Sequence, residues 1–212
     1  MTRQTAATAL GAWLAKLRLW QSVFWRAEAR LKGVEFQGRA QFQGRPIISV
    51  AKGAHLIIGD GVSIASAVRA NPLGLFQPSV LRALAPGAQL VLGRGVGLSG
   101  TVLCAGSLIE IGEQTIFGAG AMVLDNDFHV PCGEWGWSTD CTTNARPINI
   151  GRGVFVGARA IILKGVTIGD RAIIGAGAVI TRSVPSRRVV AGNPAREVNS
   201  ETLRMPGSSA TL

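Results

Sequence analysis

The chain has 212 residues, of which 47% are hydrophobic, and it contains 28 glycines and no tyrosine. This length and apolar content suffice to bury one substantial core, and no shift in composition divides the chain into two independent domains. The glycines follow no Gly-X-Y period, which excludes collagen and indicates regular turns.

The net charge of +10 is concentrated at the two ends of the chain. Residues 1–32 carry six Lys or Arg and one Glu, whereas residues 182–212 carry five Lys or Arg and two Glu. A nucleic-acid-binding protein usually has a basic stripe interleaved with aromatic residues, and this sequence has none. We therefore expect no nucleic-acid partner.

The cysteine content indicates a cytoplasmic protein. Three cysteines make an odd count, and no secretory signal pattern accompanies them. Cys132 and Cys141 share one polar stretch, where a local disulfide or a metal site is an alternative. Because their spacing matches no zinc signature, we predict no metal site.

The first predicted element is an amphipathic helix over residues 5–31, within an N-terminal segment of residues 1–32. Its apolar side chains recur at helical spacing, while Lys16, Arg26 and Arg30 fall on the opposite side. The basic residues make it too polar to span a bilayer. Two interpretations stay open: peripheral contact with the inner face of the cytoplasmic membrane, and packing against the protein itself or a neighbouring subunit.

A period of six dominates the sequence that follows. Aliphatic residues stand six apart from Ile150 to Ile180, and a small or β-branched residue follows each of them four positions later. Neither a helix nor a flat strand has this period. Three hexads would form one triangular coil of 18 residues, and stacked coils would pair their backbones. The same phase recurs from Ile58 onward, so we predict an all-β fold, a parallel β-helix over residues 33–184.

Two stretches break the period and are predicted to be loop excursions, residues 66–88 and 130–147, both rich in Pro and Gly. Long excursions from a regular scaffold often carry function. The pattern stops at Pro185, and residues 185–212 are predicted to form a short C-terminal capping tail.

The C-terminal hexads resemble those of a known family. Residues 168–181, Ile-Gly-Asp-Arg-Ala-Ile-Ile-Gly-Ala-Gly-Ala-Val-Ile-Thr, and residues 191–196, Ala-Gly-Asn-Pro-Ala-Arg, are similar to the signature of hexapeptide-repeat acyltransferases. Residues 124–129, Leu-Asp-Asn-Asp-Phe-His, resemble the sugar O-acetyltransferase branch, which includes enzymes of polysaccharide biosynthesis.

The resemblance implies several properties that the period does not show. The helix would be left-handed, although the usual crossover rule favours a right-handed one. The protein would be a homotrimer with active sites between subunits. Acetyl-CoA or another acyl-CoA would be a co-substrate, with no permanently bound cofactor, and the acyl group would pass directly to a saccharide acceptor.

His129 matches the catalytic histidine of the family. A hydroxyl is a weak nucleophile, so acyl transfer needs a general base, and an imidazole suits this role. Asp125 and Asp127 are candidates to orient the imidazole, with solvated turn residues as the equal alternative. Trp135 and Trp137 are candidate sugar-stacking platforms, or covers of a neighbouring coil.

The donor contacts implied by the resemblance lie in the C-terminal coils. Small residues would let the pantetheine arm approach the backbone, and arginines would meet the nucleotide's phosphates. The matching positions are Ala158, Ala176, Thr181, Arg182 and Arg196. Phe155 stands where the family often has Trp.

Three alternatives to a saccharide O-acetyltransferase were weighed. An N-acyltransferase of a nucleotide-linked amino sugar would use the same base and donor. A non-catalytic β-helix scaffold would explain the fold but not His129. A γ-type carbonic anhydrase needs three histidines at a metal, and this chain has two, His55 and His129, in unlike settings.

Overall fold

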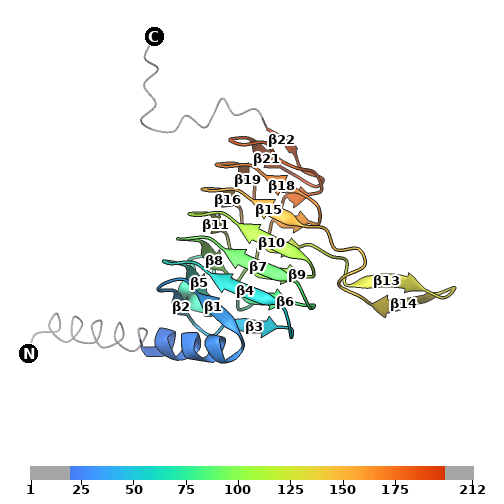
Figure 1. Cartoon of the computed structure of the whole chain (residues 1–212). Helices are drawn as coiled ribbons and strands as arrows, with labels where there is room; N and C mark the ends of the chain where they lie inside the picture. Colours follow the sequence, from blue (N-terminus) through green and yellow to red (C-terminus); the bar gives the residue numbers. More distant parts are fainter. Residues whose placement is uncertain (1–19, 199–212) are drawn as a thin grey trace, which may run out of the picture.

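The computed structural model describes residues 20–198. Three parallel sheets form the faces of a triangular prism, and the chain passes from sheet A to sheet B to sheet C in each coil. The coils stack along the prism axis, with the N-terminal coils at one end and the C-terminal coils at the other (Figure 1). The predicted all-β class and the parallel β-helix are confirmed.

The strands are short, and most have one or two buried residues, as the six-residue period requires. Sheet A consists of β1 (Val34–Phe36), β4 (His55–Ile58), β7 (Gln89–Leu92), β10 (Leu108–Ile111), β15 (Ile148–Ile150) and β18 (Thr167–Ile168). Sheet B consists of β2 (Gln41–Gln43), β5 (Ser63–Ala65), β8 (Gly97–Ser99), β11 (Ile116–Phe117), β16 (Phe155–Val156), β19 (Ile173–Ile174), β21 (Val189–Ala191) and β22 (Arg196–Glu197). Sheet C consists of β3 (Ile47–Val50), β6 (Val80–Ala83), β9 (Val102–Ala105), β12 (Met122–Leu124), β17 (Ile161–Leu163) and β20 (Val179–Ile180).

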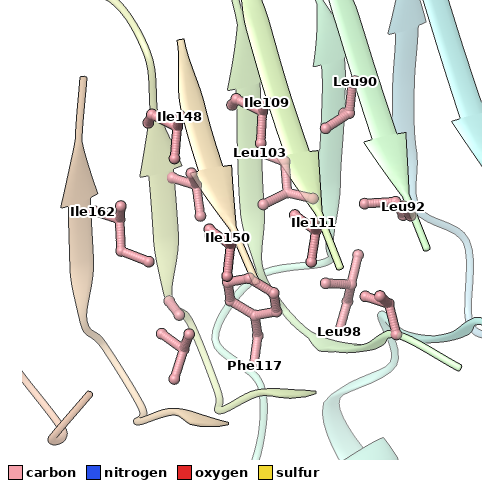
Figure 2. Packing of buried hydrophobic residues seen from close by; sticks show 14 of the residues in the cluster. Leu90, Leu92, Leu98, Leu103, Ile109, Ile111, Phe117, Ile148, Ile150 and Ile162 are labelled. Carbon is pink, nitrogen blue, oxygen red and sulfur yellow. The ribbon is translucent and has the colours of Figure 1, made fainter. Parts of the chain in front are cut away.

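The register of the sheets explains the period of six. Ile150 pairs with Ile168, Val156 with Ile174 and Ile162 with Ile180, so each residue lies beneath the residue 18 positions later. Aliphatic residues from all three sheets therefore meet along the axis, where Figure 2 shows them pointing into the prism. Burial of these columns supplies the main stabilising term of the fold.

The N-terminal helix, residues 20–31, covers the first coils (Figure 1). Ala29 joins the core cluster, and the Ser22 hydroxyl accepts a hydrogen bond of 2.9 Å from the Phe42 amide. Arg45 holds the helix from outside through bonds to both carboxylate oxygens of Glu28. The predicted residues 5–19 of this helix lie outside the described residues.

The first excursion is shorter than predicted. Residues 80–83 were placed in the loop of residues 66–88, but they form β6, which pairs with β3 and β9. Pro78 and Pro86 flank this strand rather than break it, which misled the prediction. Residues 66–79, with the 3₁₀ turn Val68–Ala70, form the actual excursion, called here the inner loop.

The second excursion leaves the prism after β12. It contains an antiparallel hairpin of β13 (His129–Cys132) and β14 (Gly136–Thr139), which projects away from the stack (Figure 1). Residues 129–147 are called here the outer hairpin. The chain rejoins the stack at β15.

The stack continues beyond residue 184, where the predicted β-helix ended. β21 pairs in parallel with β19, and β22 folds back antiparallel onto β21. Pro185 interrupts the sequence period, but Val184 still pairs with Ile168 and Val190 enters the core cluster. Residues 199–212 of the predicted tail lie outside the described residues.

Candidate active site

The predicted site residues lie at two corners and at the C-terminal end of the prism. We call the turn from sheet B to sheet C the B–C corner, formed by residues 118–121, 157–160 and 175–178 in successive coils. We call the turn from sheet C to sheet A the C–A corner, which includes residues 125–128 and 164–166. The predicted donor residues Ala158 and Ala176 lie at the B–C corner. His129 lies just beyond the C–A corner.

Small residues form a continuous column at the B–C corner. The Arg159 amide donates to the Ala119 carbonyl at 3.0 Å, and the Gly177 amide donates to the Ala158 carbonyl at 2.8 Å. Ala119, Ala158 and Ala176 therefore follow one another along the axis, rising about 10 Å at roughly 4.8 Å per coil. The column presents backbone and methyl groups, and Ala176 is exposed.

Glycine is required where these corners stack. A Cβ on Gly118 would lie 2.6 Å from the Ala158 nitrogen, and a Cβ on Gly157 would lie 2.4 Å from the Ala176 nitrogen. The corners can approach this closely only without side chains at these two positions. The strip that Ala119, Ala158 and Ala176 form along this corner is called here the donor groove, and a pocket opens on it at Ala119 and Ala158.

The remaining predicted donor residues meet at the C-terminal end of the prism. Thr181, Arg182 and Arg196 line a pocket of about 180 Å³ there, together with residues of β20, β21 and β22. All three side chains are exposed. Both guanidinium groups are open to solvent, and Nη1 of Arg196 donates to the Ala195 carbonyl at 2.9 Å.

His129 is the first residue of β13 and is exposed. In the hairpin register it lies opposite Thr139, and Pro131 lies opposite Trp137. Alternate residues of a strand share a face, so His129 and Trp137 lie on the same side of the hairpin, within reach as diagonal neighbours. Trp135, in the turn, is 88% exposed and Trp137 is 69% exposed.

Asp125 does not orient His129; its carboxylate is fully buried at the base of the excursion. One oxygen accepts from the Gly106 amide and the other from the Ser107 amide, each at 2.7 Å. Its backbone carbonyl also accepts from the Arg146 amide, near the other end of the excursion. Asp125 therefore fixes both ends of the segment that carries His129, which is a positioning role that the sequence did not reveal.

Asp127 is half-exposed and forms an ion pair with Lys164 of the next coil. Neither predicted carboxylate has a hydrogen bond to His129 among the bonds of residues 20–198. Asp140 closes the hairpin: bonds from Thr142 and Thr143 hold the pKa of its carboxyl well below the ordinary range. The other histidine, His55, lies on β4 with its Nδ1 3.4 Å from a carboxylate oxygen of Glu35.

Residues 20–198 contain no group of three His, Cys, Asp or Glu side chains placed to hold a metal ion. The three cysteines are free thiols, and burial raises the pKa of Cys104 to about 11. Across the same residues, no helix combines the length and apolarity needed to cross a bilayer.

Residues 147–182 match the family model described as bacterial transferase hexapeptide, six repeats. The coils that contain β15 to β20 therefore match this hexapeptide-repeat model, which confirms the resemblance seen in the sequence and is consistent with a left-handed β-helix.

Curated relatives match parts of the chain. Over 98 residues, 46% of this chain and 23% of the relative, it is 41% identical to mitochondrial serine acetyltransferase 3 of Arabidopsis thaliana. Over 55 residues, 26% of this chain and 23% of the relative, it is 54% identical to a 2,3,4,5-tetrahydropyridine-2,6-dicarboxylate N-acetyltransferase of Staphylococcus carnosus. The chain thus spans about a quarter of the length of these relatives.

A solved structure extends the fold match to most of the chain. An N-acyltransferase from Bacillus cereus, in complex with dTDP and 3-hydroxybutyryl-CoA, superposes with a TM-score of 0.59 at 18% identity. The match covers 82% of this chain and 86% of the other. At this identity the likeness shows the fold.

Proposed function

We propose that this protein is an acyl-CoA-dependent acyltransferase that moves a short acyl group directly from the thioester to a hydroxyl of a saccharide. The observation that carries the proposal is the donor groove, a column of small residues in which Ala119 lies in the coil that precedes His129, together with the pocket that Thr181, Arg182 and Arg196 line at the C-terminal end of the prism. A narrow arm with anionic phosphates at one end fits this arrangement. The CoA complex of the structural neighbour supports the same donor.

In this proposal, each part of the donor has a place on the prism. Arg182 and Arg196 meet the phosphates, beside Thr181, and the pantetheine arm lies over Ala176 and Ala158. The B–C corner is too tightly stacked to open, so the arm lies on the outside of the prism. The thioester then reaches the level of Ala119, in the same coil as β12.

His129 is proposed as the general base. It takes the proton from the acceptor hydroxyl as the oxygen attacks the thioester carbonyl, and the thiolate of CoA leaves with a proton returned from the imidazolium. An imidazole titrates in the range where this exchange works at neutral pH. Asp125 holds the excursion in place, and Asp127 with Lys164 braces its other side.

The site is proposed to form between copies of the chain in a homotrimer. Within one chain, β12 separates the donor groove from His129: residues 121–125 alone span roughly 13 Å at about 3.3 Å per residue. A threefold axis parallel to the prism keeps equivalent coils at equal heights. It can therefore bring the His129 of one copy to the level of Ala119 on another.

The outer hairpin is proposed to bind the acceptor. Trp137 shares a face with His129, and an exposed indole beside a base offers a flat apolar surface for a sugar ring. Residues 129–139 have few contacts with the prism, which suits an element that is completed by a substrate or a second copy.

An amino group is the alternative acceptor. A neutral amine is the stronger nucleophile, and the structural neighbour with dTDP bound is an N-acyltransferase. The serine acetyltransferase relative favours oxygen. Purified protein should therefore be offered acetyl-CoA with matched saccharides that carry a hydroxyl or an amine at one position, with mass spectrometry of the product and a thiol assay for released CoA.

An O-acetylated product with one CoA released per ester confirms the proposal. An N-acetylated product from the amine alone selects the alternative. Absence of CoA binding in calorimetry would contradict both the O-acyltransferase and the N-acyltransferase. The non-catalytic scaffold would then be the remaining alternative.

The N-terminal helix is proposed as a peripheral membrane contact. Trp20, Phe24 and Leu31 lie on one exposed face, and residues 1–32 carry a net charge of +5. Co-sedimentation with vesicles that contain phosphatidylserine tests this. Trp20→Ser with Phe24→Ser should reduce binding, and equal binding of the variant and the parent chain would contradict the contact.

A further inference from the structure

A pocket of about 480 Å³ opens at the end of the donor groove nearer the N-terminal coils, away from Arg182 and Arg196. The inner loop forms one wall and the B–C corner forms the other. Its lining residues are mostly apolar: Leu73, Gly74, Leu75, Phe76, Ala119, Ala158 and Arg159. Of these, only Ala158 belongs to the set of donor contacts expected from the sequence.

The inner loop is fixed against the corner before any ligand binds. Leu75 is 4% exposed and packs in a cluster with Ala65 and Ala119, against which Ala158 also lies. The Gln77 side-chain amide donates to the Gly100 carbonyl at 3.1 Å, which attaches the loop to the coil of β8 and β9. The wall of the pocket is therefore rigid, because it is anchored on two coils.

Phe76 closes the lower end of the groove. Its ring lies against Gly120, where a Cβ would be 2.4 Å from the nearest ring carbon. The guanidinium carbon of Arg159 lies 5.2 Å from the ring centroid, in the geometry of a cation–π contact. The ring is thus held from two sides, although 62% of the side chain remains exposed.

We infer that this pocket receives the acyl group of the donor and that Phe76 limits its length. This inference rests on the proposed function, since it takes the pantetheine arm to descend the column from Ala176 to Ala119. An arm on that path directs its acyl carbons at Leu73 and Phe76. The ring is then the side chain that the acyl carbons approach, and each further methylene brings the chain closer to it.

The chemistry of the lining agrees with an acyl group and not with a polar ligand. Leu73, Leu75 and Phe76 offer no hydrogen-bonding side chain, and the one charged group, Arg159, is directed at the ring. Discrimination by one methylene in an apolar pocket is typically about 10- to 200-fold. Phe76 is a specificity-determining residue in this account, and it takes no part in proton transfer.

The test measures thioester binding, which needs no acceptor. Isothermal titration of the full chain with CoA, acetyl-CoA and hexanoyl-CoA is compared for the parent, Phe76→Ala, Phe76→Leu and the control Phe24→Ala. Phe24 is also 62% exposed but lies on the N-terminal helix. We expect the parent and Phe24→Ala to bind acetyl-CoA more tightly than hexanoyl-CoA. In Phe76→Ala the ratio of the two dissociation constants should shift toward hexanoyl-CoA by about tenfold or more, with Phe76→Leu in between.

The outcomes separate this inference from the proposal beneath it. If CoA binds and Phe76→Ala keeps the parent's ratio, the acyl pocket is wrong while the donor groove stands. If Phe76→Ala instead changes the oligomeric state in sedimentation without changing the ratio, the ring serves a contact between copies and the inference is overturned. If CoA does not bind the parent, the proposed function fails and this inference falls with it.

Discussion

The two excursions from the β-helix differ in what holds them. The inner loop folds back onto the coils, buries Leu75 and bonds to Gly100, so the prism alone determines its shape. The outer hairpin is fixed only at its base, by Asp125 and Asp140, and beyond that point its side chains are exposed. An excursion that is already packed can form the wall of a groove. An excursion whose side chains remain exposed, such as the outer hairpin, is available to a substrate or a second copy.

In the proposed mechanism, the two corners have different roles. The B–C corner presents a backbone-floored groove with few polar side chains, whereas the C–A corner bears His129, Asp127 and Lys164. Binding of a thioester and activation of a nucleophile need these two kinds of surface. Substitutions on each side should therefore have separable effects.

The largest effect is expected from the outer hairpin. His129→Ala should lower turnover by about two to four orders of magnitude, because the acceptor proton loses its base. The matched control is His55→Ala, which removes an exposed imidazole from β4. Steady-state rates of CoA release measure both. Undiminished turnover in His129→Ala would remove the histidine from the mechanism, as would an equal loss in His55→Ala.

A substitution in the donor groove should weaken the binding of CoA and leave the chemical step unchanged. Ala176→Trp places an indole over the path of the pantetheine arm and should weaken CoA binding by at least about tenfold, or 1.4 kcal/mol. Because Ala176 is exposed, the coil keeps its packing. Calorimetry with CoA reports the loss, and Trp135→Ala on the hairpin serves as the contrast. Wild-type affinity in Ala176→Trp would place the donor elsewhere.

Asp125 should affect the stability of the fold at the base of the outer hairpin. Asp125→Ala leaves the buried amides of Gly106 and Ser107 without acceptors and should cost about 2–3 kcal/mol in the free energy of unfolding. Chemical denaturation measures it. Asp127→Ala, which removes only a surface ion pair, should cost less than about 1 kcal/mol. Equal losses for the two variants would show that Asp125 has no special anchoring role.

The smallest effect is expected from a region that belongs to neither excursion. Hydrogen bonds from Arg45 and Lys32 lower the pKa of Glu28 from 4.5 to about 2. A carboxylate with a depressed folded-state pKa stabilises the fold fully above its unfolded pKa, and this contribution is lost as pH falls from about 4.5 toward 2. Thermal unfolding of Glu28→Gln should therefore depend less on pH in that window than the parent. Parallel curves would indicate that the ion pair does not hold the helix.

The fold was predictable because the aliphatic residues that fill the prism recur at a fixed spacing in the sequence. A strict spacing of six from Ile150 to Ile180 admits stacked triangular coils, and the register of 18 follows from it. The boundaries were less predictable, because prolines signal breaks without saying on which side of a strand they fall. Pro78 and Pro86 flank β6, and the coil continues after Pro185.

The candidate site was predictable in its residue types but not in its contacts. The sequence placed Thr181, Arg182 and Arg196 together, and they line one pocket. The sequence could not tell whether a carboxylate such as Asp125 orients the histidine or accepts hydrogen bonds from backbone amides. Carboxylates of both kinds occur in a polar turn after a strand. Phe76 was missed for the related reason that a lone aromatic in a proline-rich loop has no period to reveal its partner.

The most direct test of the account uses two inactive chains together. Its central claim is that the groove of one copy and the His129 of another form each site. Chains with His129→Ala and chains with Ala176→Trp are co-expressed with different tags, and mixed assemblies are purified through both tags. All are assayed at an acetyl-CoA concentration low enough that the weakened groove of Ala176→Trp stays largely empty and each variant alone has little activity. A mixed trimer holds two copies of one variant and one of the other, so one of its three interfaces has an intact groove facing an intact histidine. Purified mixed assemblies should therefore restore about a third of the parental rate of CoA release. Mixed assemblies that remain as inactive as the separate variants would contradict the shared site.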